Sequence, residues 1–300
     1  MRVARRIKII QILSHPAFFA ALALLIIFLF KVFRIREYQS RYGVLERDDY
    51  SSEKNIYSDI DGDGIKEMIR AYNLKTNATV IATEATNTFF EAWNLPGYWY
   101  NSPEFIIKDY NGDGIEEMYA LTLNNGDSIM VHQLVLKQGQ QILRSHFVCQ
   151  INKFNGLPDH VMKLLGFCEI SGDGKKDLVL RVNAGFSLQP RTTYAWDLIN
   201  DSIFRSPEHG FTSKRTNQII CSYDSTDHRN MLFIGTVATD NYKEPVAYPD
   251  TASYAVVYTH GLDYLFGPLP LGGPQSRTST YPVTYRGNDY ILSLCFDPRR

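Results

Sequence analysis

The pattern of apolar and polar residues divides the chain into an N-terminal apolar segment and a longer part with short, alternating runs. Residues 9–30 contain no charged residue, and their polar side chains are Gln11, Ser14 and His15. At a rise of about 1.5 Å per residue, a helix of this length can cross the hydrocarbon core of a membrane. The segment therefore predicts a transmembrane helix over residues 9–30.

The residues on either side of this segment bear on its cleavage and orientation. The apolar run is longer than that of a usual signal peptide. It is followed directly by Lys31 and Arg34 rather than by a small-residue cleavage site, so we expect an uncleaved anchor, with a cleaved signal peptide as the alternative. Residues 1–8 form a basic tail, and residues 31–54 read as a polar juxtamembrane stalk. Basic residues lie on both sides, and the positive-inside rule gives a small preference for a cytoplasmic N-terminus.

Three segments after the stalk resemble one another. Residues 57–72, 107–121 and 168–182 each contain an Asp/Gly-rich loop followed by an apolar run. The first two align without a gap over D-x-[DN]-G-D-G-I-x-E-M, with Asp59 and Asp109 50 residues apart, and the third is offset by a further 60 residues. Such periods are typical of four-stranded blades in β-propellers and similar β-arrays.

Hairpin-like runs recur between these loops. Each reads as a strand, a turn rich in Asn, Asp or Gly, and a second strand. They cover residues 89–99, 194–204 and 254–266, with a weaker one over 129–143. Loop and hairpin together make a unit of about four strands, and we count about four units, the last without a recognisable metal loop. The sequence therefore predicts an all-β fold, a β-propeller-like array of about four antiparallel blades over residues 55–300, preceded by one N-terminal transmembrane helix.

The loops have the composition of a calcium site. Ca²⁺ is held by about six to eight oxygen atoms, and alternate residues of a tight loop can direct their oxygens at one centre. Gly62 and Gly64 permit the turns, because glycine adopts positive φ without strain. The expected ligands in the first loop are Asp59, Asp61, Asp63, the carbonyl of Ile65, and Glu67. The expected ligands in the second loop are Asp109, Asn111, Asp113, the carbonyl of Ile115, and Glu117.

The third loop departs from this pattern. Its expected ligands are Glu169, Ser171, Asp173, the carbonyl of Lys175, and Asp177. The longer Glu169 and the neutral Ser171 weaken the set, so we expect a lower calcium occupancy here. For all three loops the alternative is an Asp/Gly-rich turn that binds no metal, and Mg²⁺ suits such an all-protein cage less well than Ca²⁺.

An EF-hand does not explain the loops. That motif needs a bidentate Glu at loop position 12 and flanking helices. Arg70 and Ala120 stand at that position, and the flanking residues read as strands.

The D-x-D-G-D-G-x-x-E loop followed by an apolar strand resembles the FG-GAP/VCBS repeats of integrin-α-type β-propellers. The likeness extends over about residues 55–295 and is most specific at 59–67 and 109–117. Residues 196–207 and 263–274 also look like the outer hairpins of such propellers in bacterial membrane-bound sensor proteins. The resemblance implies an antiparallel propeller with calcium in loops inside the blades, located outside the cytoplasm, in the periplasm or at the cell surface.

One departure from the family concerns size. Family propellers usually close with six to eight blades, whereas about 250 residues are enough for about four blades. The alternatives are a piece of a larger protein, a four-bladed ring, and a partial ring completed by another chain.

The net charge bears on nucleic-acid binding, and the cysteine content bears on zinc sites and disulfides. The net charge of −1 does not suggest a nucleic-acid partner. Cys149, Cys168, Cys221 and Cys295 form no C-x-x-C pair, so a zinc site is poorly supported. We expect unpaired buried thiols, with one or two disulfides as the alternative in an oxidising compartment.

No motif for catalysis is present in the sequence. It contains no H-E-x-x-H, G-x-S-x-G, or G-x-x-x-x-G-K-[ST] pattern. We therefore expect a non-catalytic, membrane-anchored binding, sensory or adhesion module with a protein or carbohydrate ligand, not an enzyme. The alternatives are an extracytoplasmic enzyme acting on polysaccharides from a propeller scaffold, and the sensor part of a membrane kinase whose catalytic part lies beyond residue 300.

Overall fold

The chain divides into two compact units, residues 1–48 and residues 49–300. A computed structural model describes a few single positions between His15 and Phe28 in the first unit. In the second unit it describes residues 53–60, 62–74, 77–83, 89–137, 140–154, 157–158, 160–213, 220–224, 229–242 and 245–298.

Most of the expected transmembrane segment 9–30 lies outside the described residues. Among the positions that are described, no helix is long and apolar enough to cross a membrane. The expected tail 1–8 and nearly all of the expected stalk 31–54 also lie outside the described residues.

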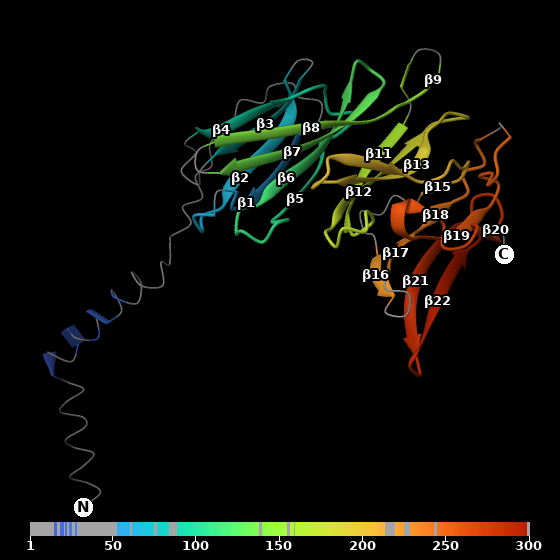
Figure 1. The fold of residues 1–300 in the computed structure, drawn as a ribbon. Coiled ribbons are helices and arrows are strands. Elements are labelled where there is room, and N and C mark those ends of the chain that lie inside the picture. The colour runs from blue at the N-terminus through green and yellow to red at the C-terminus, as the bar shows by residue number, and fades with distance from the viewer. Residues whose placement is uncertain are drawn as a thin grey trace, which may run out of the picture. The chain divides into compact units, whose positions relative to one another are not determined.

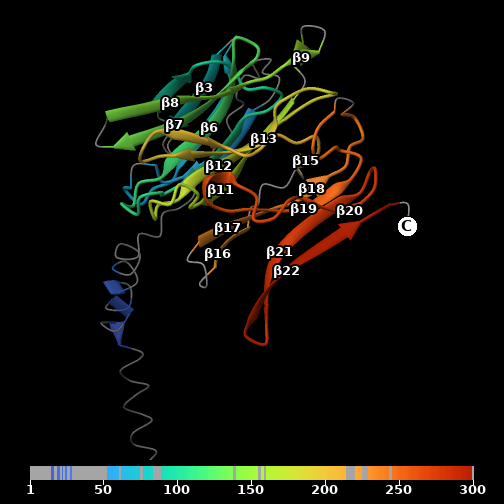
Figure 2. The ribbon, with the colours of Figure 1, turned by 45° about the vertical axis from the view of Figure 1, so that its right-hand side comes forward.

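The second unit is built from antiparallel β-sheets, and its first three sheets are simple four-stranded meanders (Figures 1 and 2). The first sheet contains β1 (Glu53–Ser58), β2 (Glu67–Leu74), β3 (Asn77–Thr83) and β4 (Phe89–Leu95). The second contains β5 (Glu104–Lys108), β6 (Glu117–Asn124), β7 (Ser128–Lys137) and β8 (Gln140–Gln150). The third contains β11 (His160–Cys168), β12 (Asp177–Ala184), β13 (Arg191–Asp197) and β14 (Ser202–Arg205). A short ribbon of β9 (Lys153–Phe154) and β10 (Leu157–Pro158) lies in the chain between the second and third sheets.

The last two sheets share the C-terminal third of the chain and are interleaved along it. The fourth sheet has the order β16 (Ile220–Asp224), β17 (Arg229–Ile234), β19 (Ser253–Tyr258) and β20 (Leu269–Gly272). The fifth has the order β15 (Thr212–Ser213), β18 (Thr236–Val237), β21 (Arg277–Tyr285) and β22 (Asn288–Phe296). The structure thus confirms an all-β protein of several four-stranded antiparallel sheets, consistent with propeller-like blades, and adds a fifth sheet to the expected four.

The first four sheets are packed face to face, each on the next, through shared apolar cores. In β6, Met118 and Ala120 join the core with the first sheet, whereas Tyr119 and Leu121 join the core with the third sheet. β12 divides its side chains in the same way between the second and fourth sheets. Because successive side chains of a strand point to opposite faces, a strand between two sheets is apolar on both. This explains why all eight residues of β12 are buried.

Two of the four expected hairpins are confirmed, a third is reduced to a single bridge, and one is wrong. β7 with β8 and β13 with β14 form the hairpins expected over 129–143 and 194–204. Residues 89–95 form a single strand, β4, whose partner is the preceding β3. After β19 the chain turns through a short 3-10 segment, η1 (His260–Leu262), in which Gly261 has a positive φ of 68°. It then returns for a single antiparallel bridge between Tyr258 and Tyr264, and the next full strand that pairs with β19 is β20.

Candidate functional site

The three Asp/Gly-rich loops occupy the same place in three successive sheets. Each loop connects the first strand of its sheet to the second, between β1 and β2, β5 and β6, and β11 and β12. The last expected ligand of each loop, Glu67, Glu117 or Asp177, is the first residue of the second strand and is buried. The repeat seen in the sequence is therefore a repeat of local structure.

The first aspartate of the loop holds the backbone of the two following glycines. In the second loop, Asp109 Oδ1 accepts a hydrogen bond from Gly112 N at 2.7 Å, and Oδ2 accepts one from Gly114 N at 3.0 Å. The first loop repeats both bonds from Asp59. The glycines of the second loop have φ of 77° and 85°, which a residue with a side chain rarely adopts. Sequence and geometry thus agree on why these positions are glycine.

The buried carboxylate at the end of each loop closes the turn from the other side. Glu67 accepts a hydrogen bond from Ile60 N at 3.0 Å, and Glu117 accepts one from Tyr110 N at 2.8 Å. Asp177 accepts bonds from the backbone of two residues in the equivalent place of the third loop. Each loop is thus clamped at both ends by carboxylates that are also expected metal ligands.

In the second loop, one expected ligand lies within hydrogen-bond distance of two others. The Asn111 amide donates to Asp113 Oδ2 and to Glu117 Oε1, each at 3.2 Å. Burial raises the pKa of Glu117 above its usual range, and the negative charges of Asp113 and Asp109 act in the same direction. Four oxygen-bearing side chains therefore share one loop.

The third loop differs from the other two in how its first carboxylate is used. Glu169 accepts one bond from Gly172 N and a second from the side-chain amide of Asn230, which lies on β17 of the next sheet. Burial raises the pKa of Asp177 to about 6, with Asp197 adding to the shift. The longer side chain at position 169 is thus used for contact between sheets.

The remaining expected ligands are placed as follows. Asp63, Asp113 and Asp173 each accept a hydrogen bond from the backbone N–H two residues later, which belongs to Ile65, Ile115 and Lys175 respectively. Ser171 donates its backbone N–H to Asp177, whereas Asp61 lies outside the described residues. In the part of the chain that the structure describes, no group of three or more His, Cys, Asp or Glu side chains is arranged to hold a metal ion. The cluster of Asn111, Asp113 and Glu117 in the second loop is not such a group, because one of its three members is an asparagine.

The residue just before each loop contacts the next sheet. Ser58 donates a hydrogen bond to Glu116 of the second loop, and the Lys108 ammonium lies 5.8 Å from the centre of the Phe167 ring on β11. Cys168 forms a disulfide with Cys221 on β16 of the fourth sheet. The expectation of unpaired thiols is therefore wrong for this pair, because the two β-carbons project toward each other across a boundary between sheets; Cys149 and Cys295 are free.

A charged cluster on the first strands escaped the sequence reading. Lys163 on β11 forms an ion pair with Glu104 on β5, and Glu104 also accepts a bond from Leu164 N at 3.0 Å. Lys54 on β1 donates to Phe105 O, and its ammonium lies over the Phe105 ring. Lys54 lies five residues before Asp59, and Glu104 lies five residues before Asp109. This shared spacing is visible in the sequence and could have indicated the cluster. In the third sheet, a register shift between Leu164 and Gly166 changes this spacing, so Lys163 cannot be recognised from it as the equivalent of Lys54 and Glu104.

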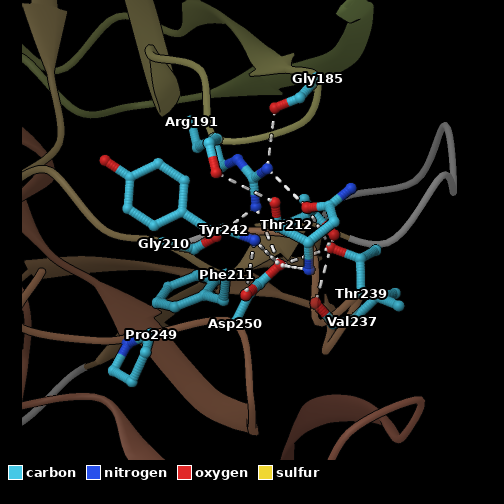
Figure 3. A network of polar contacts seen from close by, with 12 residues as sticks. Gly185, Arg191, Gly210, Phe211, Thr212, Val237, Thr239, Tyr242, Pro249 and Asp250 are labelled. Carbon is cyan, nitrogen blue, oxygen red and sulfur yellow. Dashed lines mark hydrogen bonds and ion pairs between the residues drawn. The ribbon is translucent and has the colours of Figure 1, made fainter. Parts of the chain in front are cut away.

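A second network, which the sequence did not indicate, ties the third sheet to the loop before β19. Figure 3 shows the Arg191 guanidinium directed at Asp250, 3.1 Å away, with both side chains wholly buried. Arg191 also donates to the carbonyls of Gly185 and Gly210, and Asp250 accepts from Thr239 at 2.8 Å. Each charge therefore has several hydrogen-bond partners, as a buried ion pair requires.

An open groove of about 500 Å³ lies where the first and second sheets meet. Its lining is made of amide, phenol and glycine residues, namely Asn73, Asn77, Gly97, Tyr98, Asn124, Asn125 and Gly126. No lining residue carries a formal charge. The groove can therefore offer hydrogen bonds and one aromatic ring, and it offers no acid–base pair.

No protein-family model matches the chain, and no curated protein sequence matches it.

Proposed function

We propose that this protein is a calcium-binding β-propeller module of the FG-GAP/VCBS type, anchored in a membrane with its β domain outside the cytoplasm. It acts by binding a ligand, in a sensory or adhesive role, and not by catalysis. The observation that supports this most directly is the second loop, where Asn111, Asp113 and Glu117 converge within hydrogen-bond distance. The same backbone turn recurs around Asp59 in the first loop.

The second loop fits a calcium ion in the chemistry of its donor atoms. Their donor set is oxygen-rich, as this hard cation requires: carboxylates from Asp109, Asp113 and Glu117, the amide oxygen of Asn111, and the carbonyl of Ile115. Burial is the main cause of the raised pKa of Glu117, and the negative charges of Asp113 and Asp109 add some repulsion. A bound divalent cation would offset that repulsion and would hold the turn between β5 and β6.

Calcium at these sites would act mainly on stability. If each site binds with a dissociation constant near 10⁻⁴ M, millimolar calcium adds between about 1 and 2 kcal/mol per site. The net stability of a folded domain is typically about 5–15 kcal/mol, so two sites contribute a substantial share. The loops lie beside contacts between sheets, so this stabilisation reaches the arrangement of the blades as well as the turns.

The disulfide supports a location outside the cytoplasm. Disulfides form and persist in oxidising compartments and are rare where thiols are kept reduced. Millimolar calcium is likewise found outside the cytoplasm, so Cys168–Cys221 and the calcium loops favour the same compartment. With a membrane helix over residues 9–30, this arrangement has a cytoplasmic N-terminus and an external C-terminal domain.

The experiment that tests calcium binding is calorimetric titration of the full chain in detergent micelles after chelation. We expect two stronger sites and a weaker third. Glu117→Gln should remove one of the stronger sites, whereas Glu208→Gln, at an exposed carboxylate outside the loops, should leave all sites intact. A folded sample that binds no calcium would refute the metal sites and leave an anchored β-rich domain.

A carbohydrate is the ligand class that the groove favours. Asparagine amides donate and accept hydrogen bonds as sugar hydroxyls require, and Tyr98 offers an aromatic face. Glycoside hydrolysis usually needs two carboxyl groups, which the lining residues do not supply, so the groove suits recognition better than cleavage. In a titration against an oligosaccharide panel, Asn77→Ala should weaken binding, and Asn55→Ala on the exposed side of β1 should not. If the two variants bound the oligosaccharides with equal affinity, the groove would be excluded as the binding site.

A further inference from the structure

The C-terminal hairpin has an inverted pattern of burial. β21 and β22 extend as a long hairpin beyond their neighbour β18, which pairs with β21 only at Arg277 and Thr278 (Figures 1 and 2). In most antiparallel sheets with one solvated face, apolar residues point inward and polar residues outward. In this hairpin, the face toward the fourth sheet carries hydroxyl groups, and the face toward solvent carries apolar side chains.

The inner face, toward the fourth sheet, is rich in hydroxyl groups. Thr278 and Thr280 are buried, and they pair across the hairpin with Cys295 and Ser293. The Ser253 hydroxyl on β19 lies 2.8 Å from Thr278 Oγ1. At Thr278 and Thr280 this face is therefore closed by polar contacts with the body of the domain, whereas Ile291, on the same face farther along the hairpin, is exposed.

The outer face is apolar and exposed. Because side chains alternate, it carries the odd-numbered residues of β21 and the even-numbered residues of β22. Seven large apolar side chains lie there with exposed fractions of 36% to 67%: Tyr281, Val283, Tyr285, Tyr290, Leu292, Leu294 and Phe296. The cross-strand pair Tyr281–Leu292 lies near the middle of this face. A face with so many exposed apolar side chains marks an interaction surface.

The strand at the edge of this sheet also lacks the usual protection. β22 is the last strand of its sheet, and no charged residue occurs between Asp289 and Asp297. Monomeric proteins usually protect such edges with charges, proline or bulges. The stretch of β22 from Tyr290 to Phe296 has none of these features, so we expect it to be covered in the functional protein.

We propose that the outer face of β21 and β22 is a dimerisation surface that packs against the same face of a second copy of this chain. With aromatic side chains of about 150–250 Å² each, the seven exposed residues offer on the order of 700 Å². A standard interface buries about 800 Å² on each partner, so the area matches one dimer contact. Arg277 is the one charged residue on the face, so two copies can meet without like charges at the centre and with no need for a charged partner.

A two-fold axis would place equivalent residues of the two copies together. An isologous interface uses the same patch on both chains, and two sheets pack about 10 Å apart through interdigitating side chains. Tyr281 and Leu292 lie nearest the axis in this arrangement, and Phe296 and Tyr285 lie at its two ends.

Sedimentation velocity of the full chain in detergent micelles tests the proposal across a range of protein concentrations. We expect a dimer for the wild type and a monomer for the double variant Leu292→Glu with Leu294→Glu. The matched control is Ile199→Glu, at an equally exposed apolar residue in the β13–β14 turn, which should remain dimeric. Unchanged far-UV circular dichroism and calcium affinity would show that the double variant is folded.

Covalent trapping provides a second measurement. Tyr281→Cys should form a disulfide-linked dimer under mild oxidation, whereas Ile199→Cys should not. A monomeric wild type, or a dimer that persists in the double variant, would overturn the proposal. The proposal would also be overturned if the hairpin face of the full wild-type chain bound neutral lipid vesicles and the double variant lost this binding without any change in oligomeric state. The face would then contact lipid.

Discussion

Cys168 and Cys221 are joined by a disulfide with their Cα atoms 5.6 Å apart, and this bond links the third sheet to the fourth at the base of the third loop. At the two earlier boundaries, Ser58 and Lys108 occupy the position before the loop and make non-covalent contacts with the next sheet. The covalent link therefore lies at the loop whose sequence departs most from the calcium-loop pattern, and the next sheet has no recognisable loop of this kind.

Removing this disulfide should destabilise the domain. The bond spans 53 residues of sequence, and a loop of that size corresponds to roughly 4 kcal/mol of chain entropy. We expect Cys168→Ser with Cys221→Ser to lower the free energy of unfolding by about 2–4 kcal/mol in urea titrations. Cys149→Ser, at a free thiol, should not reproduce the loss. Equal stability of the wild type with and without reductant would contradict the bond.

The fold was predictable where strands are long and loops carry a motif. The loops around Asp59 and Asp109 identified their sheets because glycines at fixed spacing are needed for positive φ. The fifth sheet was not predictable, because β15 and β18 are two residues long and have no periodicity. β18 joins β15 to β21, which lies far along the chain, and local patterns carry no information about such pairing.

The turn geometry of the candidate site was predictable from the sequence, whereas its contacts with neighbouring sheets were not. The alternation of oxygen-bearing side chains from Asp109 to Glu117 indicated the loop directly. The sequence did not indicate the hydrogen bond from Asn230 to Glu169, because this bond joins residues 61 apart on different sheets. The Arg191–Asp250 pair was hidden for the same reason: neither residue belongs to a repeated motif.

Calcium should raise the melting temperature through the first two loops more than through the third. A stabilisation of 1 kcal/mol corresponds to about 2–4 °C for a domain of this size. We expect Glu67→Gln and Glu117→Gln each to reduce the calcium-induced rise, and Asp173→Asn to change it little. Differential scanning calorimetry with calcium and with chelator gives the comparison. Equal shifts for all three variants would mean that the loops do not differ in occupancy.

Breaking the buried ion pair should cost more than breaking an exposed one. Arg191→Met leaves Asp250 charged and buried, and such a loss typically costs about 3–5 kcal/mol. Arg205→Met, in the exposed pair with Glu208, should cost less than about 1 kcal/mol. In urea unfolding, Arg191→Met with Asp250→Leu should lose less than the sum of the single variants. Strict additivity would show that the two charges are not coupled.

Acid should destabilise the domain through its buried histidines. His132 is wholly buried on β7 between the hydroxyls of Thr122 and Ser145, and burial lowers its pKa to about 4. The unfolded chain has the ordinary pKa of about 6.5, so protons bind the unfolded state more tightly. The stabilising effect is thus fully present above pH 6.5 and is lost as the pH falls toward 4, by on the order of 3 kcal/mol.

Urea unfolding between pH 7.5 and pH 4, with chelator present, measures this dependence. Burial also lowers the pKa of His209, to about 3, so it adds to the loss in the same direction. Asp177, with its raised pKa of about 6, acts in the opposite direction, because its ionised form is disfavoured in the calcium-free fold. The informative quantity is therefore the difference between the wild type and His132→Gln. That variant should start from a lower stability and lose less of it on acidification, and parallel curves would show that His132 does not titrate on unfolding.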